Sequence, residues 1–419
     1  MIINTGGRCS GPASTRFDRF AMTGENNVKD RNDSRTARRV LNIDCDVRIL
    51  LITLVFIGVG ASLVASSSSF FAGVHFSNHF ALLRLHVIKI AIALVAMVLA
   101  ICVDYRIYRK VSPLFLVVGV GMLIGLFLIP GAIRATRRWY YWATLRMALQ
   151  PSEVARLALV FFLAWWISRK GNHIADFKRG FLPAVIAVCA VVGLVASTPN
   201  FGSASATLII ALTMLFVGGA RVMHLAGLVG IGAGAGALVL WKVEYVRNRV
   251  FAFLNPEDSV TEINWQLYQS LIGLGSGGLL GRGLGESTQK LSWLPDSYTD
   301  FIFSILGEEV GLWGTLLVSG MFLLLALRAL KLSRKCNDTF GEMLAIGIGC
   351  SIFWYAAMNM YVATGMFPVT GLPLPFLSYG GSALVVNAFA VGVLLNVSRH
   401  KSERKGHVRR RLAPAVGDI

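Results

Sequence analysis

Ten stretches of this chain are each apolar and long enough to cross a lipid bilayer as a helix. A hydrocarbon core about 30 Å thick needs roughly 20 such residues per helix, and about 17 to 25 are tolerated. Only 15% of the 419 residues are charged, which is too little polar surface to cover a soluble fold. We therefore expect an all-α, polytopic membrane helix bundle. The expected spans are 49–67, 87–103, 112–130, 152–168, 181–197, 201–219, 222–241, 312–329, 343–364 and 379–396.

The distribution of Lys and Arg predicts the orientation of these spans. The chain has 40 Lys and Arg residues against 22 Asp and Glu, and a formal net charge of +18. An even number of spans places both termini on one side, and most of the basic residues fall on that side. Because Lys and Arg are retained on the inner side during insertion, both termini are expected to be cytoplasmic. The positive charge thus reflects topology, and we expect no nucleic-acid partner.

Three regions are expected along the chain. Residues 1–47 are polar and lack the apolar core of a signal peptide, so they predict a disordered cytoplasmic tail, within which Met22 is an alternative start. Residues 48–397 hold the membrane domain, and 398–419 form a basic cytoplasmic tail. The six cysteines form no CxxC pair, so neither a zinc site nor a disulfide framework is predicted, and no residue is assigned as a metal ligand.

The first unusual outer segment is 131–151, GAIRATRRWYYWATLRMALQP, which contains four arginines and no acid. Guanidinium groups bind phosphate oxygens in bidentate fashion, so Arg137 and Arg138 are candidate anion ligands. The alternative is an interfacial helix, with Trp139 to Trp142 as an aromatic belt and the arginines on lipid head groups. The residues alone favour neither interpretation.

The second unusual segment is 242–300, between the seventh and eighth spans, which is too long to be a simple connector. We expect a large, ordered extracytoplasmic loop because the segment contains aromatic and apolar residues. Its Gly273, Gly275 and Gly278 match GxGxxG, but no strand or βαβ pattern surrounds them, so a dinucleotide site is rejected.

Ionisable residues at membrane depth are functional candidates because burying charge in hydrocarbon costs a few kcal/mol. Glu153 and Arg156 are three residues apart and can form a local ion pair. Lys89 can extend its ammonium group to the interface. Asp300 is separated from Glu308 and Glu309 by roughly 12 to 14 Å along any helix, too far for two carboxylates acting on one bond.

Four of these stretches carry a resemblance to a known family. They are GRGLGESTQKLSWLPDSYTDFIFSILGEEVGLWG at 281–314, GMFPVTGLPLPFLSYGGSALV at 365–385, QPSEVARLAL at 150–159 and RRW at 137–139. From about residue 48 to 397, the chain resembles the SEDS family (shape, elongation, division and sporulation), whose members polymerise peptidoglycan glycan strands from lipid II. The family architecture is ten helices with a large loop after the seventh.

The resemblance implies roles for individual residues. The family's catalytic carboxylate corresponds to Asp300, and its basic positions correspond to Arg138 and Arg156. Glu153, Gln289 and Lys290 lie in the matching motifs and are, with Arg137, the further candidates for substrate binding. The chain also departs from the family pattern. Arg156 replaces a common Lys, Asn200 replaces an Asp, and Asp296 replaces a Glu.

The resemblance also implies a reaction and partners. We expect a peptidoglycan glycosyltransferase of the bacterial inner membrane that acts at the division septum, with an elongation-type polymerase as the alternative. Asp300 would act as the base, and the arginines or a divalent cation (Mg or Mn) would stabilise the leaving diphosphate. The expected partners are lipid II, membrane lipid, a class B penicillin-binding transpeptidase and other divisome proteins. A lipid II flippase and a structural scaffold are the competing readings.

Overall fold

The computed structural model describes residues 45–128, 138–142, 147–254, 262–291 and 293–411. Residues 1–44 of the expected N-terminal tail, Arg137 and the last eight residues of the C-terminal tail lie outside these residues. The described helices belong to one unit, Asp46–Ile419.

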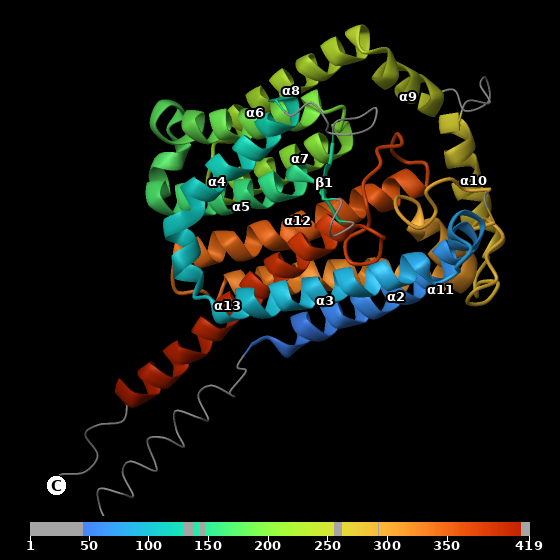
Figure 1. Ribbon diagram of the computed structural model, residues 1–419. Coiled ribbons are helices and arrows are strands. Elements are labelled where there is room, and N and C mark those ends of the chain that lie inside the picture. The colour runs from blue at the N-terminus through green and yellow to red at the C-terminus, as the bar shows by residue number, and fades with distance from the viewer. Residues whose placement is uncertain (1–44, 129–137, 143–146, 255–261, 292, 412–419) are drawn as a thin grey trace, which may run out of the picture. The chain divides into compact units, whose positions relative to one another are not determined.

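Each of the ten apolar stretches forms a helix (Figure 1). In the described part of the chain, nine helices are long and apolar enough to cross a membrane, and α7 is a shorter apolar helix of 17 residues. A helix of that length is at the lower limit for a membrane span. Together, these helices confirm the prediction of an all-α, multi-pass membrane protein. The bounds are α2 Val47–Phe76, α3 Ala81–Cys102, α4 Tyr105–Leu128, α5 Pro151–Lys170, α6 Leu182–Ser197, α7 Phe201–Val217, α8 Val222–Lys242, α11 Ile302–Ser333, α12 Thr339–Ala363 and α13 Gly381–Arg411.

Local sequence signals mark several helix ends. The Asp46 side chain accepts a hydrogen bond from the Arg48 N–H at the start of α2, and Asp338 does the same for Gly341 at the start of α12. Helix α5 begins at Pro151 and ends with Arg169 and Lys170, whose charges complement the negative end of the helix dipole.

Helices α5, α12 and α13 are mostly buried, whereas α8 is mostly exposed. Small residues allow neighbouring backbones to approach closely at the centre, as is usual in membrane bundles. A Cβ at Gly392 of α13 would lie 2.4 Å from the Met97 carbonyl oxygen of α3. A Cβ at Gly119 of α4 would lie 3.1 Å from the Ala155 Cα of α5. These glycines therefore set the spacing between helices.

The eighth span begins earlier than expected. The sequence places it at 312–329, but α11 begins at Ile302 and contains a break at Gly311, which has φ +75° and ψ −166°. The predicted span covers only the apolar part of the helix after residue 312, where several large apolar side chains are exposed. The preceding turns are buried and pack against the 273–289 segment, a tertiary contact that hydropathy alone does not reveal.

The two long outer segments contain additional elements. Strands β1 Tyr140–Trp142 and β2 Met147–Leu149 pair antiparallel, with Tyr140 opposite Leu149. The described part of the arginine-rich loop is therefore two strands rather than an interfacial helix. The 171–181 connection contains a 3-10 turn, η2 Gly171–Ala175, and a π-helical turn, η3 Phe177–Phe181. The 242–300 segment contains α9 Glu244–Leu254 and α10 Glu262–Ser276.

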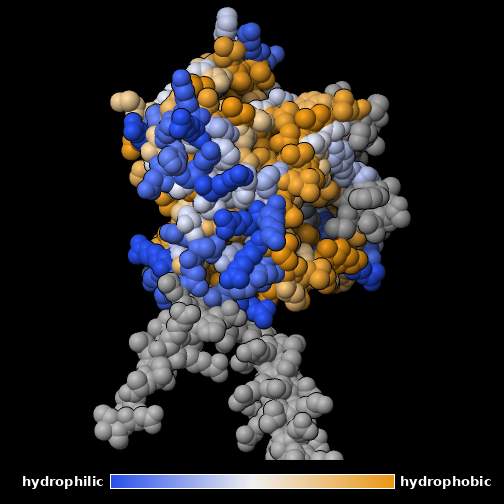
Figure 2. Space-filling model, turned by 90° about the vertical axis from the view of Figure 1, so that its left-hand side faces the viewer, coloured by the Kyte–Doolittle hydropathy of each residue, from blue (hydrophilic) through white to orange (hydrophobic). Residues whose placement is uncertain are grey.

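One end of the bundle is strongly basic. The turns between α3 and α4, between α5 and α6 and between α11 and α12 all lie there, and Figure 2 shows hydrophilic residues gathered on this face beside apolar flanks. Those turns and the adjoining helix ends contribute the cations Arg106, Arg109, Lys110, Arg169, Lys170, Lys178, Arg179, Arg334 and Lys335. A polar cap beside apolar flanks is the surface expected where a bundle leaves the bilayer.

Candidate functional site

Asp300 lies immediately before α11, and three segments hold it in place. Its backbone N–H donates to the Asp296 carbonyl oxygen at 3.1 Å. Its own carbonyl oxygen accepts a 2.7 Å hydrogen bond from Asn359 Nδ2, which also donates to the Leu372 carbonyl oxygen at 2.6 Å. The amide of Asn359 therefore ties the Asp300 segment to the segment before α13. Because Asn359 is buried in α12, this link is firm.

Gly371 lets the chain pass close to the Asp300 carboxylate. Its φ is +70°, which favours glycine, and a Cβ there would lie 3.2 Å from Asp300 Oδ2. Asp296 has a φ of +52°, a conformation that Asp tolerates better than Glu does. Its carbonyl oxygen accepts hydrogen bonds from the N–H groups of Thr299, Asp300 and Phe301. The shorter acid at 296 thus suits a tight turn that presents Asp300.

The surroundings raise the pKa of Asp300 to about 7. Burial is the largest cause, and the nearby Asp296 carboxylate adds to it, whereas Arg138 and Arg249 act in the opposite direction. Burial also raises the pKa of Asp296. A carboxylate with a pKa near neutral is well matched to accept a proton from a hydroxyl group.

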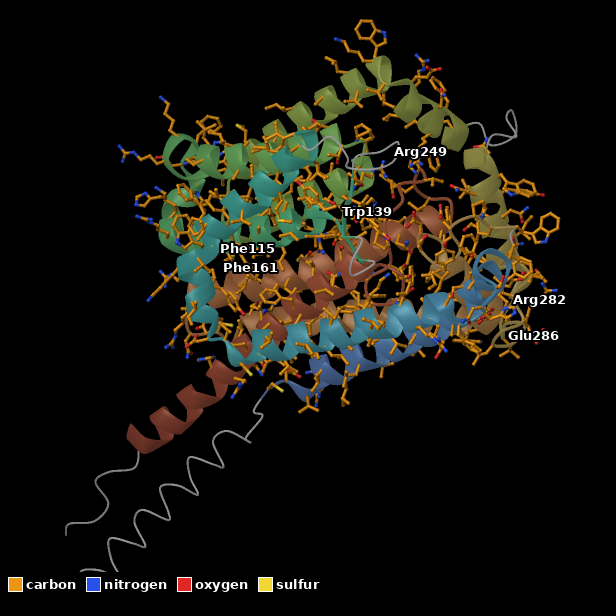
Figure 3. All side chains as sticks on the ribbon, in the orientation of Figure 1. Phe115, Trp139, Phe161, Arg249, Arg282 and Glu286 are labelled. Atoms are coloured by element: carbon orange, nitrogen blue, oxygen red, sulfur yellow. The ribbon has the colours of Figure 1, made fainter. Side chains whose placement is uncertain are left out.

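Two guanidinium groups flank this carboxylate. Arg138 donates through Nε to the Thr198 carbonyl oxygen at 3.2 Å and through a terminal nitrogen to Pro199. Arg249 of α9 donates to the Val369 carbonyl oxygen at 2.8 Å. Figure 3 shows Arg249 and Trp139, the neighbour of Arg138, at the same end of the bundle. Both arginines thus border the turns around Asp300.

A cavity of about 190 Å³ lies beside Arg249. It is lined by residues of the 199–205 turn and helix, of α9 and of the 367–370 segment, including Thr370. The Thr370 hydroxyl is buried and has no hydrogen-bond partner among the described residues. The rest of the lining is mainly apolar, so the cavity fits a ligand with an apolar body and a polar group.

Arg156 and Glu153 lie in a different, fully buried cluster inside the bundle. Their side chains are 2.7 Å apart, and Arg156 also binds Asn387 Oδ1 of α13 at 3.0 Å and the Ser351 hydroxyl of α12. The guanidinium lies 4.1 Å from the ring centre of Tyr355. These contacts join α5, α12 and α13 at the centre of the bundle. In the described residues, no hydrogen bond or ion pair connects this cluster with Asp300.

Gln289 and Lys290 lie in a segment that is fastened to α11. The buried Glu308 carboxylate accepts hydrogen bonds from the Ser287 and Thr288 side chains and from the backbone N–H of Thr288 and Gln289, at 2.5 to 3.2 Å. Lys290 Nζ lies 3.5 Å from Glu309 and 3.0 Å from the Ser66 hydroxyl. The Gln289 side chain is buried against α10. Both Gln289 and Lys290 therefore have contacts within the protein. Contact of either residue with the substrate stays a prediction.

Arg249 and Asn359 were not singled out from the sequence. Arg249 belongs to EYVRNRV, in which Glu244 accompanies two arginines. That mixture of charges is typical of an ordinary exposed helix. Asn359 was a detectable signal, since it is an amide within an apolar helix. Asn200, where the family has Asp, caps α7 by accepting from the Ser203 N–H at 3.3 Å. An amide fulfils that capping role as well as a carboxylate does.

Comparison with known proteins agrees with this architecture. Residues 47–403 match the model of the FtsW/RodA/SpoVE family of cell cycle proteins. The chain belongs to this family. It is 38% identical over 359 residues to a probable peptidoglycan glycosyltransferase FtsW of Trichlorobacter lovleyi, covering 84% of this chain and 93% of that protein. It is 37% identical over 358 residues to stage V sporulation protein E of Bacillus subtilis, covering 85% and 97%.

Solved structures share the fold. A chain of a peptidoglycan synthase complex that coordinates polymerization and crosslinking aligns with a TM-score of 0.69 at 24% identity, covering 85% of this chain and 98% of that one. The rod shape determining protein RodA of Thermus thermophilus aligns with a TM-score of 0.64 at 24% identity, covering 85% and 97%. The helix order described above is therefore that of the FtsW/RodA/SpoVE fold.

Proposed function

We propose that this chain is a division-type peptidoglycan glycosyltransferase that polymerises lipid II. The observation that carries the proposal is Asp300, a largely buried carboxylate with a pKa of about 7, which lies near two arginines at one end of a membrane bundle. Relatives named as probable FtsW glycosyltransferases support the same activity. The basic face at the other end supports cytoplasmic termini, and with that orientation Asp300 would lie on the outer side of the inner membrane.

The site can perform glycosyl transfer in one balanced step. Asp300 accepts the proton of the sugar 4-hydroxyl on one lipid-linked substrate while that oxygen bonds to the anomeric carbon of the other. The bond between the anomeric carbon and the phosphate oxygen breaks, and undecaprenyl diphosphate leaves with the electron pair. Arg138 and Arg249 stabilise the charge that develops on the diphosphate. The proton held by Asp300 is then released to water.

A divalent cation is compatible with this site. In the described residues, no group of three or more His, Cys, Asp or Glu side chains could hold a metal alone. Mg²⁺, however, is commonly bound by one or two carboxylates together with substrate phosphates, and Asp296 and Asp300 fit that pattern. A bound cation would supply charge neutralisation for the diphosphate.

A transpeptidase partner fits a second feature of the bundle. A cavity of about 870 Å³ lies between α10, α11 and α12. The small residues Gly307, Gly311, Thr315 and Ser319 line it at every fourth position of α11. Small side chains allow another membrane helix to pack closely. We infer that the single membrane helix of a class B penicillin-binding protein occupies this cavity, and that the complex works with other divisome proteins at the septum.

The alternative function is lipid II transport. The buried Glu153 and Arg156 pair is the feature that favours it, because transporters bind their substrates at charged groups within the bundle. The two charges, however, pair with each other at 2.7 Å, and Arg156 is also held by Asn387, Ser351 and Tyr355. Asp300 and its arginines lie at the bundle end, where a polymerase would need them.

Paired assays on reconstituted protein test the proposal. Liposomes with the wild-type chain and its transpeptidase partner are given lipid II, and glycan polymer and lipid II translocation are measured separately. Asp300→Asn should reduce polymer about 100-fold or more, because general-base catalysis contributes about 10²- to 10⁴-fold. Glu286→Gln, an exposed change in the same loop region, is the control. Normal polymer from Asp300→Asn would refute the base assignment, and translocation without polymer would favour the transporter.

A further inference from the structure

Helix α3 contains two ionisable residues that face the start of α13. His86 and Lys89 are three residues apart and share a helix face. Lys89 does not extend away from the bundle. Its ammonium nitrogen lies 3.7 Å from the ring centre of Tyr379, and a Cβ at Gly381 would lie 3.2 Å from the Lys89 Cδ and Cε. The cation is therefore held against the first residue of α13.

Apart from their contacts with the Tyr379 ring, neither side chain has a hydrogen bond or an ion pair in the described part of the chain. The His86 ring is fully buried, and neither of its nitrogens has a hydrogen-bond partner among the described residues. Lys89 forms no ion pair within the described part of the chain. Unpaired polar groups at membrane depth are costly, so residues of this kind usually serve a ligand.

The position of Lys89 is electrostatically unfavourable without an anion. The N-terminus of a helix carries partial positive charge and favours negative groups. Helix α13 has no acidic residue in its first turn, and its Ser382 hydroxyl already bonds the Ala148 carbonyl oxygen at 2.6 Å. Lys89 therefore places its positive charge beside the partial positive charge of the α13 N-terminus. An anion bound between Lys89 and the first N–H groups of α13 would stabilise both.

The proposed reaction requires two diphosphates. Both substrates are lipid-linked, and each carries a diphosphate. One diphosphate leaves at Arg138 and Arg249, and the other stays on the acceptor lipid. The α13 start is joined to the catalytic segment, since the Tyr379 N–H donates to the Tyr298 carbonyl oxygen at 2.9 Å and their rings are in contact. Tyr298 is two residues before Asp300. A lipid anion at Lys89 would thus border Asp300's segment through Tyr298.

We propose that Lys89, His86 and the N-terminus of α13 form a second anion site, which binds the diphosphate of the acceptor lipid. The inference rests on the proposed polymerase function for the identity of the ligand. Lys89 supplies the charge, the N–H groups of α13 supply directional donors, and His86 packs against the Tyr379 ring that Lys89 contacts.

Binding is tested without turnover. The full-length chain in phosphatidylcholine nanodiscs is titrated with undecaprenyl diphosphate, and bound lipid is counted by native mass spectrometry. The wild type should bind two molecules and Lys89→Met one. Lys89→Arg, which keeps the charge, should restore the second. Arg84→Met, an exposed cation on the same helix, is the matched control and should bind two.

Kinetics separate a binding role from a structural one. With the partner present, Lys89→Met should raise the KM for lipid II about tenfold or more, because a lost charge-assisted hydrogen bond weakens binding by about that factor, with little change in kcat or in the thermal midpoint. A lower thermal midpoint with unchanged KM would show a packing role and overturn the site. Equal competition by phosphatidylglycerol would show a general phospholipid site and also overturn it.

The two proposals fail separately. Two bound diphosphates that fall to one in Lys89→Met, in a chain that makes no polymer, would uphold the second site and refute the polymerase. A single bound diphosphate in an active polymerase would refute the second site alone.

Discussion

Asp300 and Asp296 show how one turn sets the chemistry of a carboxylate. Burial is the main cause of the raised pKa of Asp300, and the Asp296 charge adds to it. A carboxylate acts as a base only when it is ionised, so activity should fall as the pH drops below about 7.

Replacing Asp296 tests this coupling. Asp296→Asn removes the neighbouring negative charge, so the pKa of Asp300 should fall and the acid limb of the pH–rate profile should move to lower pH. Asp300 remains buried in this variant, so its pKa, and with it the midpoint of the acid limb, should stay above that of a free Asp. The measurement is kcat/KM for glycan synthesis against pH. An unmoved limb would mean that Asp296 does not influence the titrating group.

The flanking arginines are tested by lysine substitution. Arg138→Lys and Arg249→Lys keep the charge but lose the planar fork that pairs with phosphate oxygens. Each should lower kcat/KM for lipid II about tenfold. Arg247→Lys, an exposed change on the same helix as Arg249, is the control. Equal rates for all three variants over a range of lipid II concentrations would assign the arginines to the lipid interface instead.

At the scale of elements, the link between α11 and the 281–291 segment organises the loop. Glu308 gathers at least four hydrogen bonds from Ser287, Thr288 and Gln289, and it pairs with Arg282 at 3.1 Å. Gly311 allows α11 to bend at this level. The family motif around 281–314 is therefore a structural clamp as well as the approach to Asp300.

Removing the clamp should loosen the loop. Glu308→Gln leaves the shape but removes the charge that accepts these bonds, which should destabilise the fold by about 2 kcal/mol. The expected readout is a lower thermal midpoint in detergent and faster proteolysis within 281–291. Glu286→Gln changes an exposed carboxylate in the same segment, which lies near Arg282 in Figure 3, and should be neutral. Equal thermal midpoints for both variants would show that Glu308 is not the anchor.

At the scale of the whole molecule, the cavity between α10, α11 and α12 is the proposed seat of the partner helix. Gly320 lines it, and nothing lies within 4 Å of a Cβ placed there. A larger side chain can therefore enter the cavity without disturbing the chain itself.

Filling the cavity should block the partner. Gly320→Leu should weaken transpeptidase binding at least tenfold and abolish its stimulation of glycan synthesis, while the low activity of the chain alone is unchanged. Gly236→Leu, at an equally open position on the exposed face of α8, is the control. Copurification and polymer assays give both readouts. Undiminished stimulation of Gly320→Leu would place the partner elsewhere.

The sequence by itself determined the membrane bundle, because burying backbone in hydrocarbon requires long apolar helices, and apolar length is visible in one dimension. It also determined Asp300 as the candidate base, through the resemblance carried by the 281–314 motif. The surroundings of Asp300 depend on residues far apart in the chain. Asp300 lies near Arg249, Asn359 and Gly371 only because three helices and two loops converge there. No local sequence pattern predicts these neighbours.

Tertiary structure also decided which charges are already neutralised. Arg156, Glu153 and Lys290 look alike in sequence as candidate ligands, yet all three have partners within the fold. Lys89 looks like an ordinary interfacial lysine, yet it lies over Tyr379 at the start of α13. Whether a charge is available to a ligand depends on its neighbours in space, and packing alone chooses them.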